Sequence, residues 1–169
     1  MTMTEKIIFV DTNDELVGTG TREEAWAKGI YVRISRAIIK DENGRILSQH
    51  RSVLKKSYPN RWTDSASGHV DEGDTYDSAI VRELEEEIGT TTALTYIGKF
   101  RSEDEIEGKK IFEFNSIYEG SSDSSIEIQL QESEVSEVRW FEVGELKDLM
   151  EREPDMFTPG FRETIRRFY

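Results

Sequence analysis

The sequence predicts a single mixed α/β domain, and three observations support this fold class. The chain has 169 residues, of which 34% are charged and 36% are apolar, as expected for one globular domain with a polar surface. Short apolar runs with strand-like spacing alternate with segments of helical spacing. No internal repeat, low-complexity tract or linker interrupts residues 1–169, so we expect one domain.

The first third of the chain predicts strands and a short helix. Residues 5–22 are typical of strand, turn and strand, and with the following segment they form an expected N-terminal hairpin extension over residues 1–30. Residues 22–29 predict a short helix that ends at a glycine. Residues 30–52 predict the clearest hairpin, because Asn43-Gly44 is the strongest short-range turn signal.

The rest of the chain predicts a polar loop over residues 52–67, then a helix. Ile80, Leu84 and Ile88 are four residues apart, and Gly89 is a suitable C-cap, so Thr75–Ile88 should be helical. The remaining expected elements are two strands at 94–100 and 110–120 joined by an acidic loop, a strand at 136–143, and helices at 144–153 and 161–169.

Composition excludes several classes of function. With 22 Lys and Arg against 35 Asp and Glu, the net charge of −13 disfavours binding to a nucleic-acid polymer, although a metal ion can still bring in a small phosphorylated substrate. The absence of cysteine excludes disulfides, thiolate metal sites and a cysteine nucleophile. There is no long apolar segment or leader pattern, so we expect a cytoplasmic protein without a membrane partner.

The predicted helix carries three carboxylates along the edge of its apolar face. Helical geometry places Glu83, Glu86 and Glu87 on one strip, while Glu85 points away from the core. Two such carboxylates repel by about 3 kcal/mol at an effective dielectric near 20, and the helix C-terminus adds to the cost. A solvated acidic face is the alternative, but such a face should lie opposite the core. A hard divalent cation, which prefers oxygen ligands, would remove the repulsion.

Residues 68–90 resemble the Nudix box, in which Gly, five residues, Glu and seven residues precede Arg-Glu-apolar-x-Glu-Glu-x-Gly-apolar. The matching positions are Gly68, Asp74, Arg82, Glu83, Leu84, Glu86, Glu87 and Gly89. Two positions depart from the pattern: Asp74 replaces a glutamate, and Thr90 replaces an apolar residue. The resemblance implies structural roles for Gly68, Asp74, Arg82 and Gly89, with Asp74 pairing with Arg82.

The resemblance also implies a fold and an activity. The fold is a Nudix-type α/β/α sandwich with a mixed sheet and a loop-helix-loop catalytic motif. The activity is metal-dependent hydrolysis of a phosphoanhydride bond in a nucleoside diphosphate or a derivative of one. By position, Glu83, Glu86, Glu87 and the backbone carbonyl of Ser67 would bind Mg²⁺ or Mn²⁺. Glu83 and Glu86 are the candidates for the catalytic base, and the later-loop residues Glu132 and Glu134 are alternatives.

Most of the chain resembles the Nudix branch that includes isopentenyl-diphosphate isomerase. That isomerase uses a cysteine in the segment matching residues 63–69, and this chain has none. A hydrolase is therefore favoured, and an isomerase-like enzyme or a non-catalytic nucleotide- and metal-binding sensor remain alternatives. Both Arg51 and Lys55 are candidates for binding the substrate's diphosphate. The expected partner is a small phosphorylated molecule, a nucleotide; the base, the leaving group and a homodimer stay open.

Overall fold

The computed structural model describes residues 5–169; residues 1–4, which the predicted domain includes, lie outside the described residues. The strands are β1 (Ile7–Val10), β2 (Leu16–Gly20), β3 (Tyr31–Lys40), β4 (Ile46–Arg51), β5 (Trp62–Thr63), β6 (Ala66–His69), β7 (Leu94–Ile106), β8 (Lys109–Ser121) and β9 (Val135–Phe141). The helices are α1 (Arg22–Lys28), α2 (Tyr76–Ile88), α3 (Val143–Arg152) and α4 (Pro159–Phe168), with a 3₁₀ turn at Pro154–Met156.

These nine strands form one mixed sheet around β3. Strand β3 pairs antiparallel with β1, β4 and β6, and parallel with β8 along its whole length. Strand β7 extends the sheet beyond β8, while β5 and β9 pair with β4. The predicted mixed sheet is confirmed.

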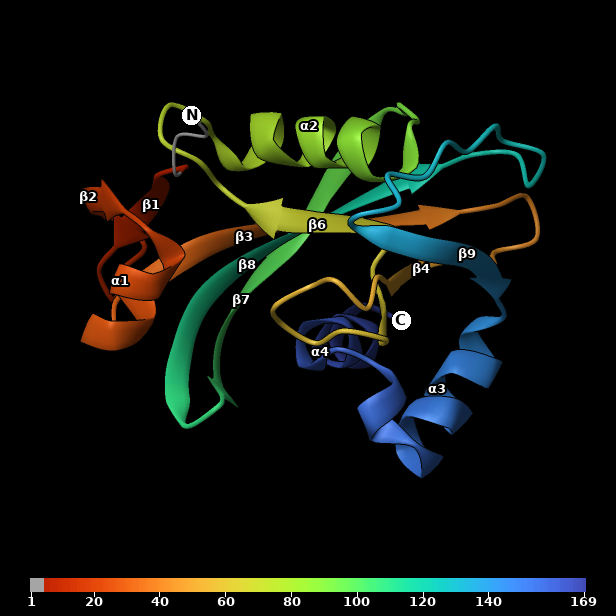
Figure 1. Ribbon diagram of the computed structural model, residues 1–169. Helices are drawn as coiled ribbons and strands as arrows, with labels where there is room; N and C mark the ends of the chain where they lie inside the picture. Colours follow the sequence, from red (N-terminus) through yellow and green to blue (C-terminus); the bar gives the residue numbers. More distant parts are fainter. Residues whose placement is uncertain (1–4) are drawn as a thin grey trace.

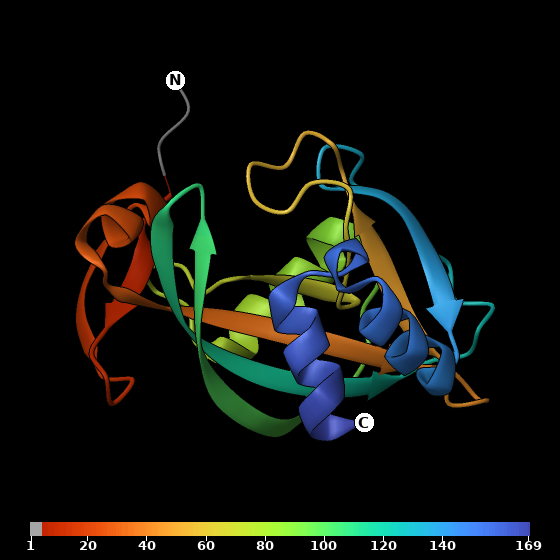
Figure 2. The same cartoon turned by 90° about the horizontal axis from the view of Figure 1, so that it is seen from below.

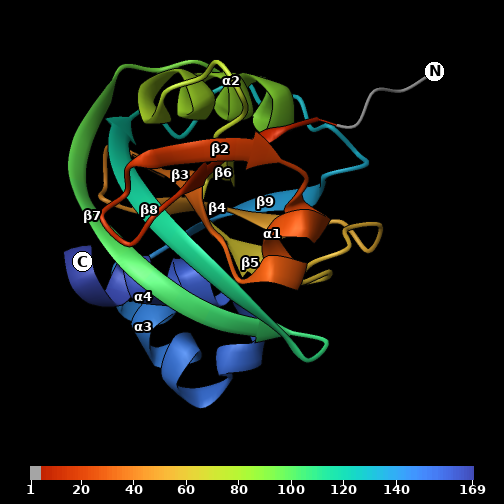
Figure 3. The same cartoon turned by 90° about the vertical axis from the view of Figure 1, so that its left-hand side faces the viewer.

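Helices cover both faces of this sheet (Figure 1). Successive side chains of β3 point to opposite faces. Ala37 and Ile39 pack in a cluster with Ile80, Leu84 and Ile88 of α2, whereas Ile38 packs with residues of α3 and α4. Figure 3 shows α2 on one side of the sheet and the two C-terminal helices on the other. The predicted α/β/α sandwich and the apolar stripe of α2 are confirmed.

Two loop predictions were wrong. The acidic segment 101–108 is not a loop, because β7 and β8 run on to a tight turn at Glu107-Gly108, where both residues have positive φ. The segment 52–67 contains β5 and the first half of β6, so the loop between β4 and β5 covers residues 52–61 only. Figure 2 shows this loop and the β7–β8 hairpin on the same face as α3 and α4.

The N-terminal segment follows the prediction within residues 5–30. Strands β1 and β2 form a hairpin, and α1 begins at the N-cap Thr21, whose hydroxyl accepts a hydrogen bond from Glu24 N. Gly29 ends α1 in the left-handed conformation, which glycine adopts without strain. Within the described part of the chain, no helix combines the length and the apolarity that a membrane span requires.

Candidate active site

Helix α2 is fixed at both ends and along its core face. Thr75 and Ser78 form a capping box at its start, and Gly89 caps its end in the left-handed conformation with φ 66°. Its buried side chains include Ile80, Leu84 and Ile88, which pack on the sheet. Because the helix is fixed in this way, the directions of the carboxylate side chains on its edge are fixed too. Two of them, Glu83 and Glu87, reach strand β6.

Glu83 and Glu87 are the two carboxylates that meet β6. The Glu87 carboxylate accepts a hydrogen bond of 2.9 Å from the backbone N–H of Ser67. Glu83 lies against Gly68, where an added Cβ would sit 2.4 Å from the Glu83 carboxyl carbon. Only glycine fits at position 68 without displacing Glu83, which gives this motif residue its physical role.

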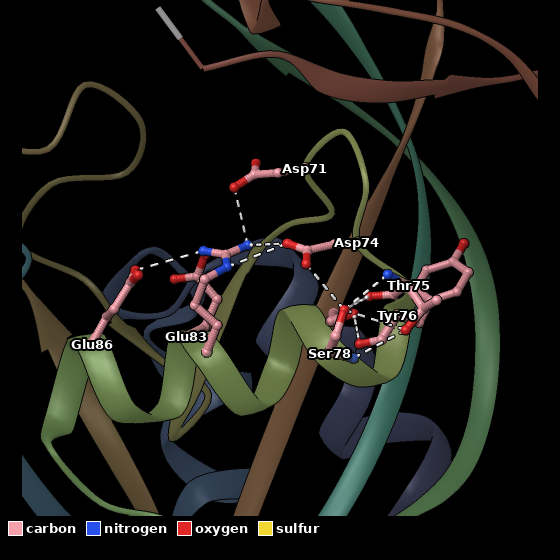
Figure 4. A network of polar contacts seen from close by, with 9 residues as sticks. Asp71, Asp74, Thr75, Tyr76, Ser78, Glu83 and Glu86 are labelled. Carbon is pink, nitrogen blue, oxygen red and sulfur yellow. Dashed lines mark hydrogen bonds and ion pairs between the residues drawn. The ribbon is translucent and has the colours of Figure 1, made fainter. Parts of the chain in front are cut away.

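Arg82 joins the loop before α2 to the helix itself. Its guanidinium lies 3.0 Å from Asp74, 3.1 Å from Asp71, 2.9 Å from Glu83 and 3.6 Å from Glu86 (Figure 4). The shorter aspartate at position 74 thus still reaches Arg82. Asp71 was not among the predicted site residues, although it is the first acidic residue after Gly68 in the motif loop.

Glu86 differs from the other two strip residues. Its side chain is 53% exposed and its carboxylate faces Arg82, whereas the Glu87 residue is only 4% exposed. Over residues 5–169, no three acidic or histidine side chains already converge as a ligand set. Arg82 occupies the space between Glu83 and Glu86, so the three carboxylates share one region without meeting at one point.

Burial sets the charge state of the inner carboxylates. Burial raises the pKa of Glu83 to about 7, with Arg82 acting in the opposite direction. Burial, reinforced by Glu83, raises the pKa of Glu87 to about 8. In the described chain, no cationic side chain forms an ion pair with Glu87. An oxygen-rich donor set with unbalanced negative charge fits a hard divalent cation, so the residues present are compatible with Mg²⁺ or Mn²⁺.

A cavity of about 460 Å³, here named the carboxylate cavity, opens beside the strip. Its wall includes Ser67, Gly68, Asp71, Arg82, Glu83, Glu86, Glu87, Lys55, Glu134 and Arg22. The ammonium of Lys55 is bound to Glu134. Of the two later-loop candidates for the base, Glu134 therefore lies at the cavity, whereas Glu132 does not line it.

Arg51, which the sequence predicts as a substrate ligand, is bound within its own loop, and its contact with substrate stays a prediction. Its guanidinium donates to the carbonyl oxygens of Ser57 and Tyr58 and to the Ser57 hydroxyl, so it closes the loop between β4 and β5. It lines a second cavity of about 120 Å³, here named the side cavity. The side cavity shares Lys55, Ser67, Gly68, His69 and Arg22 with the carboxylate cavity, so the two adjoin.

His69 stands where the two cavities meet. Burial lowers its pKa to about 3, and nearby cations including Arg22 and Lys55 lower it further, so the imidazole is neutral. Its buried Nε2 atom has no hydrogen-bonding partner within residues 5–169. Arg22 was missed by sequence reasoning, because it reaches the site from α1 and no local pattern connects it with residues 68–90.

The fold agrees with the comparisons with known proteins. The NUDIX domain model matches residues 31–168, and the chain therefore belongs to the Nudix family. A prenyl-diphosphate phosphatase from Methanosarcina mazei is 32% identical, with 95% of this chain and 92% of that protein covered. An isopentenyl-diphosphate Δ-isomerase from Serratia proteamaculans is 31% identical, over 94% of this chain and 88% of that protein.

Solved structures share the fold at lower identity. A protein from Deinococcus radiodurans superposes with a TM-score of 0.81 at 23% identity, covering 98% of this chain and 99% of that one. The NUDIX domain of NrtR from Shewanella oneidensis, solved with ADP-ribose, gives a TM-score of 0.62 at 16% identity, with coverage of 87% and 96%. The sequence relatives thus include both proteins named as Nudix hydrolases and isopentenyl-diphosphate isomerases.

Proposed function

We propose that this protein is a metal-dependent hydrolase that cleaves a phosphoanhydride bond of a nucleoside diphosphate or a derivative of one. The observation that carries the proposal is the position of Glu83 and Glu87, two enclosed carboxylates that meet β6 beside an open cavity with a lysine at its wall. Membership of the Nudix family supports the same class of reaction.

The chain's own residues divide the work at this site. Glu83, Glu86 and Glu87, with the backbone carbonyl of Ser67, would hold Mg²⁺ or Mn²⁺. Such an ion neutralises diphosphate oxygens and makes water a better nucleophile. Lys55, once released from Glu134, would contact the phosphates. Arg82 forms ion pairs with both Glu83 and Glu86 and so holds their side chains in place.

The general base is a carboxylate at the wall of the carboxylate cavity. Glu83 and Glu86 are the candidates within the motif, and Glu86 is the more solvent-accessible of the two. Glu134 is the candidate from the later loop, because it lines the same cavity. A base must lie within hydrogen-bonding reach of the attacking water, and all three positions border the space where that water would stand.

A prenyl diphosphate is the second candidate substrate, because a relative that aligns over nearly the whole chain carries that activity in its name. The lining of the side cavity disfavours it. Arg36, Asp104 and Glu113 line that cavity, and burying charged groups against a hydrocarbon chain is costly. The isomerase reaction is disfavoured further, since the chain has no cysteine.

A substrate screen tests the proposal. Nucleoside di- and triphosphates, nucleotide sugars, dinucleoside polyphosphates and a prenyl diphosphate are each incubated with the protein in Mg²⁺, in Mn²⁺ and in EDTA. Phosphate release or product formation is then measured. We expect metal-dependent turnover of a nucleotide class. Cleavage of the prenyl diphosphate alone would contradict the substrate assignment. Metal-induced thermal stabilisation without any turnover would favour the sensor alternative.

A further inference from the structure

The side cavity has a sheet floor and an aromatic rim. Ile34 and Arg36 of β3, Asp104 of β7 and Glu113 of β8 line it, with Tyr58 and Trp26 from the loop between β4 and β5 and from α1. It adjoins the carboxylate cavity through Ser67, Gly68 and His69. A group attached to a diphosphate in the carboxylate cavity would therefore extend into the side cavity.

Two carboxyl groups of this lining lack a partner. Asp104 lies opposite Ile111 and Glu113 opposite Ser102, so the two acidic residues are close on paired strands. Neither carboxyl makes a hydrogen bond or an ion pair with any residue of the described chain. Arg36, whose charge acts on both carboxyl groups, is already engaged elsewhere, because it donates from Nε to Asn115 and from Nη1 to Asp64 at 2.7 Å.

The rim adds flat surfaces and one unpaired donor. Tyr58 adopts a positive φ of 48° in the loop that Arg51 closes and lines the cavity, with the Arg61 guanidinium over its ring at 5.2 Å from the ring centre. The buried indole N–H of Trp26 has no hydrogen-bonding partner within residues 5–169. Aromatic faces suit a planar ring, and unpaired carboxyl oxygens require N–H or O–H donors from whatever binds there.

We propose that the side cavity binds the nucleobase, and that Glu113 with Asp104 selects bases that carry an exocyclic amino group. The inference rests on the proposed function and deepens it by naming the substrate class. An amino group donates to a carboxyl oxygen. A carbonyl oxygen at the same place of the ring would face the carboxyl lone pairs and leave both groups unpaired, which is costly in a buried site.

The protonation state of Glu113 sets how strongly it can select. Burial raises the pKa of Glu113 to about 7, with Arg36 acting in the opposite direction. A protonated carboxyl group both donates and accepts, so it pairs with a carbonyl beside a ring N–H as well as with an amino group beside a ring nitrogen. The carboxylate form only accepts, so selection of the amino group belongs to the carboxylate form and should strengthen as pH rises above about 7.

Kinetics with matched substrate pairs test the inference. Cytidine and uridine diphosphate are one pair, and adenosine and inosine diphosphate are another; the members of each differ by an amino group in place of a carbonyl. We expect kcat/KM to be about tenfold or more higher for the amino member of at least one pair. Glu113→Gln should shrink this ratio mainly by raising KM. Glu105→Gln, an exposed glutamate of the paired strand β7, is the matched control and should keep the ratio.

The possible outcomes distinguish a failure of the base-selection inference from a failure of the proposed hydrolase function. Metal-dependent turnover of nucleotides with equal kcat/KM within both pairs would overturn the inference and leave the hydrolase assignment standing. The role of Glu113 would also be overturned if Glu113→Gln and Glu105→Gln changed the kcat/KM ratio within a pair to the same extent. If no nucleotide is cleaved in either metal, both the inference and the proposed substrate class fail. The wild-type ratio is decisive even where a variant does not fold.

Discussion

Glu87 is held in a place where its negative charge is costly. It is 4% exposed, and burial, with Glu83 nearby, raises its pKa to about 8 from an ordinary value of 4.5. The folded protein therefore binds this proton more tightly than the unfolded chain does. Its contribution to stability is full below about pH 4.5 and is lost as pH rises towards about 8.

The Glu87→Gln variant should remove this loss. In EDTA, the free energy of unfolding of the wild type should fall on the order of 2 kcal/mol more than that of the variant between pH 5 and pH 8.5. Urea unfolding at both pH values measures the difference. The amide oxygen of glutamine still accepts from the Ser67 N–H, so the backbone contact is kept. If the free energy of unfolding changed equally with pH in the two proteins, burial of the Glu87 charge would not destabilise the fold.

At the residue scale, the sequence predicted positions within one local motif and missed those brought in from elsewhere. The Asp74–Arg82 pair and the C-cap at Gly89 depend on neighbours along the chain. Arg51 is predicted to bind the substrate because a cation near a motif is often a phosphate ligand, and this role stays a prediction. The structure also shows its guanidinium bound to loop carbonyls, an arrangement that no spacing rule predicts.

At the element scale, two glycines of the C-terminal helices offer a matched test. A Cβ at Gly160 in α4 would lie 2.0 Å from the Arg36 guanidinium, which is buried and paired with Asp64. Gly144 in α3 has no heavy atom within 4 Å of an added Cβ. We expect Gly160→Ala to lower the free energy of unfolding by about 2 kcal/mol or more, because it disturbs a buried ion pair. Gly144→Ala should raise it by about 0.5 kcal/mol through helix propensity.

Thermal and urea unfolding of these two variants give the comparison. Equal effects of both substitutions would mean that α4 can move away from Arg36 without loss. Because Gly144 lies in a helix of similar length on the same face of the sheet, it controls for a general effect of replacing a helical glycine.

The turn between β1 and β2 anchors the N-terminal hairpin through Asp14. Its side chain is 7% exposed and accepts hydrogen bonds from Arg33, Lys99 and Tyr76 at 2.7 to 2.8 Å. Burial alone would raise the pKa of Asp14, but these donors hold it below its usual range. The resulting stability is present above about pH 4 and is lost as pH falls through the lowered pKa.

Asp14→Asn should therefore lower the free energy of unfolding at neutral pH by about 2 kcal/mol. The exposed Glu15→Gln is its control and should change stability little. Both are measured by urea unfolding at pH 7 and again at pH 3.5, where the difference between them should shrink. A difference that stays constant with pH would assign the loss to packing and not to charge.

The hairpin β7–β8 marks a limit of sequence reasoning at this scale. Segment 101–108 has so many acidic residues that it was taken for a loop, yet its exposed and less exposed residues alternate as in a strand. The alternation was masked because Glu103 and Asp104 differ little in hydrophobicity while facing opposite sides. The same hairpin supplies Asp104 and Glu113 to the side cavity, so this error also hid part of the candidate site.

For the whole molecule, the fold class was predictable because the motif over residues 68–90 is local and specific. The parallel pairing of β3 with β8 and the antiparallel pairing of β3 with β6 were not predictable, because they join segments distant in sequence. These pairings bring α1, the loop after β4 and the β7–β8 hairpin together around one pair of cavities. The side cavity, which we propose selects the substrate, is thus a product of tertiary structure.

The net charge of −13 also has a meaning for the whole molecule. An anionic protein repels an anionic substrate, so under the proposed function a bound cation and Lys55 would reverse the potential locally at the carboxylate cavity. Activity on a nucleotide should then depend on the strip residues of α2 far more than on other glutamates of that helix.

The most direct measurement compares Glu87→Gln with Glu85→Gln at saturating nucleotide, in Mg²⁺ and in EDTA. Both changes remove one carboxylate from α2, but Glu87 faces β6 and Glu85 faces solvent. We predict that Glu87→Gln lowers kcat by about 10²-fold or more while Glu85→Gln stays within about twofold of the wild type, and that EDTA abolishes turnover in all three. Equal activity of the two variants would contradict the assignment of the strip as the metal-binding catalytic site.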